Sequence, residues 1–268
     1  MAGAARKARR DDQGRMSLGE HLIELRKRLG VIGASIIVAA VGGWFLADPV
    51  WHALSDPILS IALERDRTAE INYTTVTEAF DTKIAIAVVL GIVLAAPVWL
   101  YQVWAFFVPA LMKRERRLAL GFLSAAVPLF LAGVAAGWFV LPNIVKLMTS
   151  FAPEQSATLL TAKVYLDFAL KLVLAIGIGF VMPVFLVLLN FIGVLEARSI
   201  IKGWRVAIVV IALFTAIATP AADVVSMVLL AIPMVILYFI AAGVATLHDR
   251  RAAKKLDAIV EPEASSRD

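Results

Sequence analysis

The chain contains no cysteine and only three histidines, which lie far apart at His21, His52 and His248. Without cysteine there can be no disulfide, no thiol nucleophile and no cysteine-ligated metal, and the histidine spacing matches no metal motif. No phosphate-binding loop and no nucleophile–base pair can be recognised either. We therefore expect a protein that is not an enzyme and that carries no metal and no cofactor.

Apolar residues, by contrast, are abundant. They make up 61% of the 268 residues, and the mean hydropathy is +0.85. Soluble domains are nearer half apolar, so the sequence predicts an all-α membrane protein, with runs long enough for six transmembrane helices. The predicted spans are roughly 29–48, 79–105, 118–141, 164–192, 204–219 and 224–246.

Lysine and arginine orient these spans. Of the 26 basic residues, 20 fall in segments 1–28, 106–117, 193–205 and 247–268. Basic residues concentrate in cytoplasmic loops, which predicts that both termini are cytoplasmic. The net charge of +5 then reflects those loops, and we expect no nucleic-acid partner.

The spans also carry features of a bent bundle. The fifth span has only 16 residues, about 24 Å of helix against a hydrocarbon core of about 30 Å, and such a mismatch is relieved by local thinning of the bilayer. A short helix shielded by its neighbours explains the length equally well. Prolines that kink helices fall inside four spans, at Pro97, Pro128, Pro183 and Pro233. Together these features favour a concave bundle.

Two acidic residues stand in strongly basic segments next to apolar spans: Glu24 in HLIELRKRL and Glu115 in LMKRERRL. Membrane proteins usually place basic residues there, so two carboxylates from different inside segments could receive a pair of positive charges. The simpler alternative is local. Glu24 could pair with Lys27 or Arg28 one turn along a helix, and Glu115 could only moderate the basic cluster around it.

Aromatic residues precede Glu115 in VWAFFVPAL, among them Trp104 and Phe106. An aromatic belt at the membrane surface explains them, but aromatic faces beside a carboxylate also suit a guanidinium group. The middle of the predicted membrane region holds no chain of titratable residues. A small-solute secondary transporter, the main alternative function, would need such polar groups and repeated halves.

Three motifs carry a resemblance to a known family: HLIELRKRL, APVWLYQVWAFFVPAL followed by KRERR, and LLAIPM at 229–234. They closely resemble the TatC family, the membrane receptor of the twin-arginine protein translocase, and the similarity runs from about residue 17 to 247. The resemblance implies a six-helix, glove-shaped bundle in the cytoplasmic (inner) membrane. It also implies binding of twin-arginine signal peptides of folded proteins, which are exported by the proton-motive force.

The partners that the resemblance implies are TatA, TatB, other copies of the chain and membrane lipid. By position, Glu24 and Glu115 resemble the family's acidic signal-peptide site, together with Arg26 and Phe106, while Pro57, Pro97 and Asp223 fall on positions that matter in its membrane domain. Two departures stand out: Val181 occupies a place where relatives often have Glu, and TPAAD replaces TPPD before Asp223. Residues 1–16 and 248–268 lie outside the resemblance, and we expect them to be disordered tails.

Overall fold

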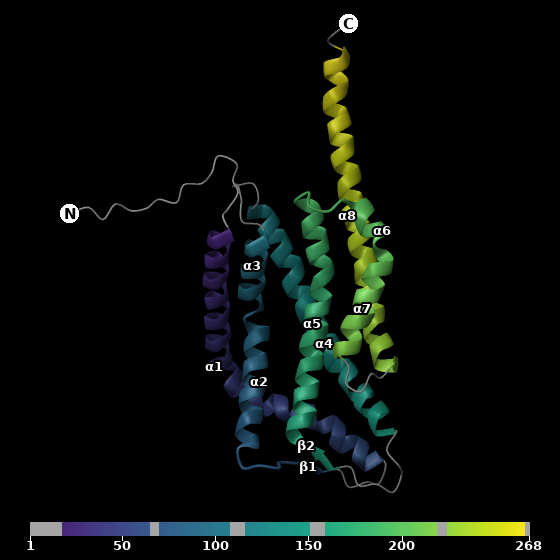
Figure 1. Ribbon diagram of the computed structural model, residues 1–268. Coiled ribbons are helices and arrows are strands. Elements are labelled where there is room, and N and C mark those ends of the chain that lie inside the picture. Colours follow the sequence, from purple (N-terminus) through teal and green to yellow (C-terminus); the bar gives the residue numbers. More distant parts are fainter. Residues whose placement is uncertain (1–17, 65–69, 108–115, 151–158, 219–223, 266–268) are drawn as a thin grey trace, which may run out of the picture.

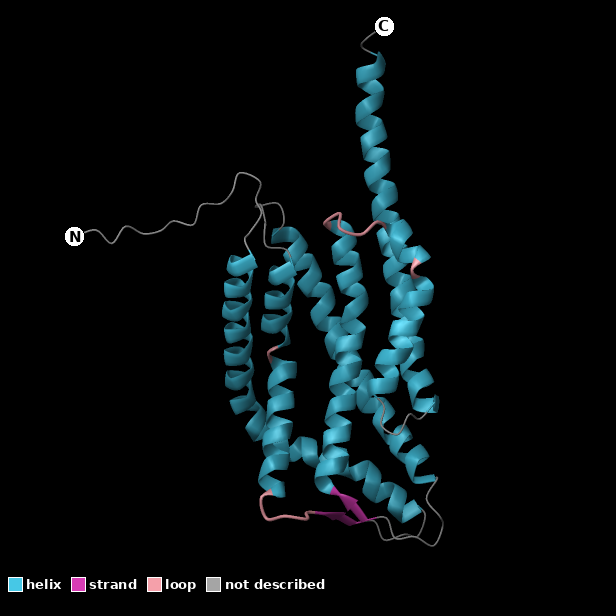
Figure 2. Ribbon diagram, in the orientation of Figure 1, coloured by secondary structure: helices cyan, strands magenta, loops and turns pink. Residues whose placement is uncertain are grey.

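The computed structural model describes residues 18–64, 70–107, 116–150, 159–218 and 224–265, which form eight helices and two short strands (Figures 1 and 2). The elements in chain order are α1 (Leu18–Glu64), β1 (Glu70–Asn72), α2 (Glu78–Leu94), α3 (Ala96–Phe107), α4 (Arg116–Ser150), β2 (Leu159–Thr161), α5 (Ala162–Phe191), α6 (Ala197–Lys202), α7 (Trp204–Ala218) and α8 (Val224–Ser265).

Four of the described helices are long and apolar enough to cross a membrane: the spans lie within α1, α4, α5 and α8. The pair α2–α3 makes a fifth if it is counted as one broken span, and α7 is apolar but shorter. The prediction of an all-helical membrane protein is therefore confirmed, apart from the two strands. The predicted shortness of the span at 204–219 is also found, because α7 ends at Ala218.

The predicted second span, 79–105, is not one continuous helix. It breaks at Ala95, and α2 and α3 meet there at an angle of 60°. Pro97 lies two residues after the break; it cannot donate a backbone hydrogen bond, and its ring clashes with the preceding turn. The Ile92 carbonyl, in the last turn of α2, accepts a bond of 2.9 Å from the Trp99 indole N–H. The side chain thus satisfies a carbonyl that faces the break.

Two further segments differ from the expectation. The first predicted span ends at residue 48, but α1 continues to Glu64, and its second half runs across the lower end of the bundle (Figure 1). At the other end of the chain, the sequence placed a disordered tail from residue 248. Instead α8 continues to Ser265 and extends beyond the other helices (Figure 1).

β1 and β2 pair in parallel, with Ile71 opposite Leu160, and join two segments that lie between different predicted spans. Apolar packing holds the helices together above this sheet. One core cluster joins α1, α2, α4 and α5 around Leu54, Ile86 and Leu172. Another joins α3, α4 and α5 around Phe130.

Helices α4 and α5 approach each other closely at two glycines. A Cβ atom built on Gly133 lies 2.9 Å from the Gly177 Cα and 2.9 Å from the Ile176 carbonyl oxygen, so only glycine fits there. Gly137, one turn further along α4, faces Val173 in the same way. This small-xxx-small pattern is a common way for membrane helices to bring their backbones together.

Candidate functional site

The first candidate site lies where the start of α1 meets α3. Glu24 is on α1, and its Oε1 atom accepts two hydrogen bonds from Arg28, one turn further on: 3.0 Å from Nε and 2.5 Å from Nη2. The Glu24 side chain is 20% exposed. Its second oxygen, Oε2, is buried and has no hydrogen-bond partner among the described residues. Of the two pairings that the sequence left open, the structure thus has Arg28.

Arg28 also connects the two helices. Its Nη1 group donates a hydrogen bond of 3.0 Å to Oε1 of Gln102 on α3. The guanidinium therefore lies between a carboxylate on α1 and an amide on α3. Such a planar group with several donors suits this shared position better than an ammonium group.

Aromatic rings border the same junction. His21 stacks on Phe106 with ring centroids 4.4 Å apart. Trp104 is buried, and its indole N–H has no hydrogen-bond partner among the described residues. The structure thus brings together Glu24 and the predicted site residue Phe106, and it adds His21, Arg28 and Gln102, which sequence reasoning did not select. Gln102 gave no signal in the sequence, since its role depends on how α1 packs against α3.

The other predicted residues are less closely grouped. Arg26 is exposed on α1, and Pro97 is exposed beside the α2–α3 break. Pro57 lies within α1, in the half that crosses the end of the bundle. Glu115 and Asp223 lie outside the described residues. Val181, the first of the two departures from the family pattern, is 2% exposed and makes apolar contacts in the α3–α4–α5 core.

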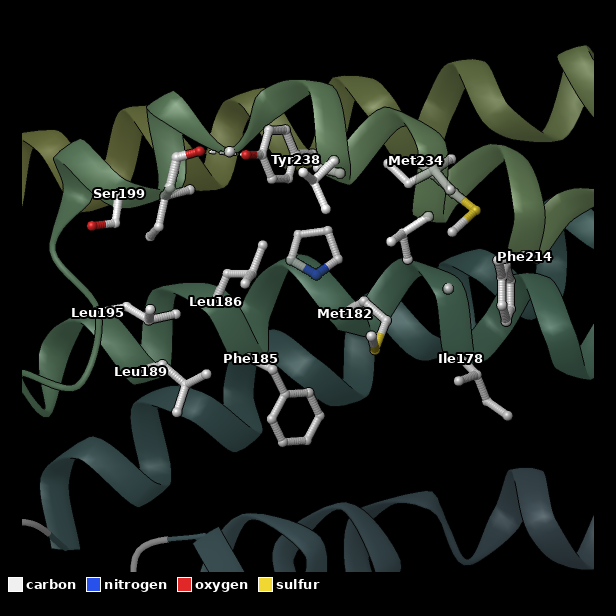
Figure 3. Close-up of a pocket in the computed structure, with 18 residues that line it drawn as sticks. Ile178, Met182, Phe185, Leu186, Leu189, Leu195, Ser199, Phe214, Met234 and Tyr238 are labelled. Carbon is white, nitrogen blue, oxygen red and sulfur yellow. Dashed lines mark hydrogen bonds between the residues drawn. The ribbon is translucent and has the colours of Figure 1, made fainter.

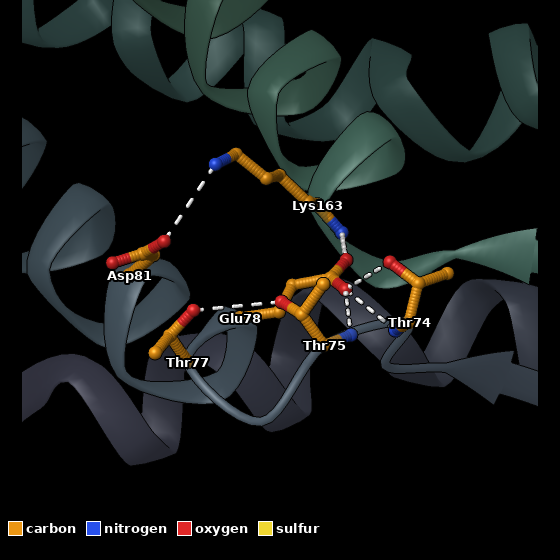
Figure 4. A network of polar contacts seen from close by, with 6 residues as sticks. All are labelled: Thr74, Thr75, Thr77, Glu78, Asp81 and Lys163. Atoms are coloured by element: carbon orange, nitrogen blue, oxygen red, sulfur yellow. Dashed lines mark hydrogen bonds and ion pairs between the residues drawn. The ribbon is translucent and has the colours of Figure 1, made fainter.

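A second polar cluster lies at the opposite end of the bundle, around Glu78 at the start of α2 (Figure 4). The Glu78 side chain is almost fully buried. Its Oε2 atom accepts bonds from the Thr74 backbone N–H (2.6 Å), the Thr74 hydroxyl (2.7 Å) and the Thr75 N–H (3.3 Å). Its Oε1 atom accepts a hydrogen bond of 3.1 Å from the backbone N–H of Lys163, in the first turn of α5.

One carboxylate thus caps the start of α5 and fixes the turn that leads into α2, beside the parallel strands that precede the two helices. The Thr75-x-x-Glu78 spacing is that of a capping box, a local signal that sequence reasoning missed. The contact to Lys163 had no such signal. Burial, and then the Glu78 carboxylate, raise the pKa of the Tyr73 phenol above its ordinary value.

Ion pairs surround Glu78. Lys163 lies 3.7 Å from Asp81, and Lys83 lies 2.7 Å from Asp48 with its ammonium 5.0 Å from the centroid of the Trp44 ring. These pairs are largely exposed and contribute little stability each. Among the described residues no group of three metal-ligating side chains occurs. The Glu78 cluster, which we call the clamp, joins the start of α2 to the start of α5, and the Lys83–Asp48 pair separately joins α2 to α1.

Comparison with known proteins shows which family has this sequence and architecture. Residues 20–233 match the family model of the Sec-independent protein translocase protein (TatC). The chain belongs to the TatC family. The TatC protein of Xylanimonas cellulosilytica is 44% identical over 241 residues, which cover 90% of this chain and 87% of that relative. The TatC protein of Rothia mucilaginosa is 37% identical over 245 residues, covering 91% and 84%.

The fold agrees with the family. A crystal structure of the twin arginine translocase receptor TatC matches with a TM-score of 0.71 and 32% identity, over 85% of this chain and 98% of that one. A second crystal structure of the receptor TatC, in DDM, matches with a TM-score of 0.72 and covers 84% of this chain and 99% of that one. This TatC-family chain is accordingly a component of a protein translocase, with helices that span a membrane.

Proposed function

We propose that this chain is the receptor and core subunit of a twin-arginine translocase. In this role it binds the twin-arginine signal peptides of folded proteins at the junction of α1 and α3. With TatA, TatB and further copies of itself, it exports those proteins across the cytoplasmic membrane by means of the proton-motive force. Family membership and the likeness to a translocase receptor support this role.

The main support for a peptide-binding site at this junction is that Glu24 already binds a guanidinium group, that of Arg28. Arg28 donates to one oxygen of the carboxylate, while the other oxygen, buried, is left without a partner among the described residues. A carboxylate with a free oxygen at a half-buried helix junction suits a second guanidinium, because charge-assisted bonds strengthen away from water. The Phe106–His21 stack offers an aromatic surface beside it.

Glu115 supplies the second carboxylate in this proposal. It immediately precedes α4 in the sequence, and α3, which carries Phe106, packs against both α1 and α4. Each arginine of the peptide meets one of the two acids, and exposed Arg26 belongs to the same binding site as Phe106. Arginine binds a carboxylate through a planar fork, whereas lysine is a compact, strongly hydrated charge. A twin-lysine peptide should therefore bind more weakly at equal charge.

The proposed topology has six crossings with both termini in the cytoplasm: α1, the broken pair α2–α3, α4, α5, α7 and α8. The start of α1 and the end of α8 lie at the same end of the bundle (Figure 1), which supports an even number of crossings. The described basic residues at the start of α1, on α6 and near the end of α8 lie at this end, as expected for a cytoplasmic side. In the same proposal the bundle is concave, Pro97 shapes it by breaking the second span, and Pro57 and Asp223 act at its outer side.

A binding titration tests the proposed function. A fluorescent twin-arginine signal peptide and its twin-lysine version are titrated into the purified full-length protein in detergent. We expect the wild type to prefer arginine by about tenfold, since a hydrogen-bonded charge pair is worth roughly 1.5–3 kcal/mol. Glu24→Gln and Glu115→Gln should each remove most of that preference.

Glu196→Gln is the matched control, because Glu196 is an exposed acid in the loop before α6 and makes no side-chain capping bond. It should leave the preference unchanged. Equal binding of the two peptides to the wild type, or equal effects of Glu24→Gln and Glu196→Gln, would show that recognition lies elsewhere in the complex.

A further inference from the structure

An apolar cavity of about 600 Å³ opens between α5 and α7, with α6 and α8 closing two of its sides (Figure 3). We call it the α5–α7 cavity. Its lining runs along α5 from Ile178 to Leu189 and from Gly203, just before α7, along that helix to Phe214, with Met234 of α8 behind. Ser199 and Leu195 lie at one end and Ile178 and Phe214 at the other (Figure 3).

The cavity has the length of one membrane leaflet. Eleven residue steps along each lining helix correspond to about 16 Å, and half of a hydrocarbon core of about 30 Å is about 15 Å. The lining is almost wholly apolar along this distance. An extended hydrocarbon chain that enters from one surface and stops near the midplane fits these dimensions.

One end of the cavity is basic. Arg198, Lys202 and Arg205 are exposed on α6 and at the start of α7, and none of them forms an ion pair within the described part of the chain. Lys202 is one helical turn from Ser199, which lines the cavity mouth. The Arg205 guanidinium lies over the Trp204 ring, 5.5 Å from its centroid, and tryptophan is enriched at the level of lipid headgroups.

This basic end is held rigidly in place. The Asp249 carboxylate of α8 accepts two hydrogen bonds. One, of 2.8 Å, comes from the Ala197 backbone N–H at the start of α6, and the other, of 2.9 Å, from the Asn190 side-chain amide at the end of α5. The Tyr238 hydroxyl donates to the Ile200 carbonyl. The backbone of α6, which carries Arg198 and Lys202, is therefore anchored to α5 and α8 before any ligand binds, which lowers the entropic cost of binding.

We propose that the α5–α7 cavity binds one acyl chain of an anionic glycerophospholipid, whose phosphate lies at Arg198, Lys202 and Arg205. A transmembrane helix of a partner protein fits less well. A helix at least 10 Å wide and 16 Å long fills roughly 1,250 Å³, about twice the cavity. A soluble polar ligand finds no partners in the apolar lining. The lipid site rests on these observations alone and does not depend on the peptide site.

Photolabelling tests the proposal on the full-length protein. The protein is placed in phosphatidylcholine nanodiscs that contain a trace of phosphatidylglycerol with a photoreactive group near the end of one acyl chain. After illumination, the labelled residues are mapped by mass spectrometry. We expect labels on α5 and α7 residues that line the cavity near Ile178 and Phe214, and excess unlabelled phosphatidylglycerol should compete where phosphatidylcholine does not.

Two variants and their controls sharpen the test. Ala207→Phe fills the cavity and should remove the label, whereas Val209→Phe, on the outer face of α7 with Val209 65% exposed, should not. Arg198→Gln with Lys202→Gln should reduce the preference for phosphatidylglycerol about thirtyfold, since each basic residue near the surface contributes about 1 kcal/mol. The control pair Arg250→Gln with Arg251→Gln, exposed on α8, should leave it unchanged.

The competition experiment needs only the wild type, so the proposal stays testable even if Ala207→Phe fails to fold. Label spread evenly over lipid-facing residues, or competition by phosphatidylcholine as strong as by phosphatidylglycerol, would overturn it. So would protection of the cavity by a co-purified protein segment in place of lipid. A negative result here would leave the peptide titration above unaffected.

Discussion

Arg28 directs two of its N–H groups at a single oxygen of Glu24 and a third at Gln102 on the neighbouring helix α3. In the free protein the proposed peptide-binding carboxylate is thus already paired with an arginine of the same chain. Because the remaining oxygen is buried, an incoming arginine must either displace this group or bind that oxygen after α1 and α3 move apart. Arg28 therefore belongs to the site as an internal competitor.

The first prediction concerns this competitor. Arg28→Met keeps an unbranched apolar stem of similar length but removes the charge. Because a partly exposed i,i+4 pair is worth about 0.5 kcal/mol, we expect twin-arginine peptides to bind about twofold more tightly. The titration described above measures the effect.

Lys27→Met serves as its control, since Lys27 is an exposed neighbour that forms no ion pair within the described residues. It should have a smaller effect. Weaker peptide binding by Arg28→Met would mean that Arg28 orients Glu24 for the peptide and does not compete with it.

The second prediction concerns the clamp at the other end of the bundle. Glu78→Gln keeps the size of the side chain but offers only one acceptor oxygen where the carboxylate uses two. Its amide nitrogen must then face an N–H donor. We expect a lower melting temperature and faster amide hydrogen exchange at the start of α5, around Lys163.

Asp56→Asn is a suitable comparison, because Asp56 is an exposed acid on α1 with no ion pair among the described residues. Exchange around Lys163 should stay slow in that variant. If Glu78→Gln leaves exchange there unchanged, the clamp does not stabilise the start of α5.

The third prediction concerns the crossing of α4 and α5. Gly133→Ala places a Cβ atom 2.9 Å from the Gly177 Cα and the Ile176 carbonyl oxygen, so the helices must separate. Overpacking of this kind costs roughly 1–3 kcal/mol. The change should appear as a lower unfolding temperature in detergent.

Gly243→Ala on α8 provides the matched control, since a Cβ there meets nothing within 4 Å. Alanine is about 1 kcal/mol better than glycine inside a helix, so this variant should be neutral or more stable. Equal stability of the two variants would show that the close approach at Gly133 is not maintained in solution.

Much of the helical framework was predictable, because a long run of apolar residues is needed for a helix that contacts lipid or the protein core, and such a run is visible in the sequence. The span predicted at 164–192 matches α5, and that at 204–219 matches α7 almost to the residue. At the candidate site, Glu24 and Phe106 were selected from local composition and the family resemblance, and the structure places both at the α1–α3 junction. Glu115 and Asp223, outside the described residues, remain predictions.

The sequence by itself determined that this is a helical membrane protein of the TatC family, because hydropathy and long motifs are local properties of the chain. Only the tertiary structure decided that α2 and α3 meet at 60°, that Arg28 joins Glu24 to Gln102, and that Glu78 caps α5 across 85 residues of sequence. Each of these features depends on which helices pack together. Such contacts between distant segments leave no period or spacing in the sequence.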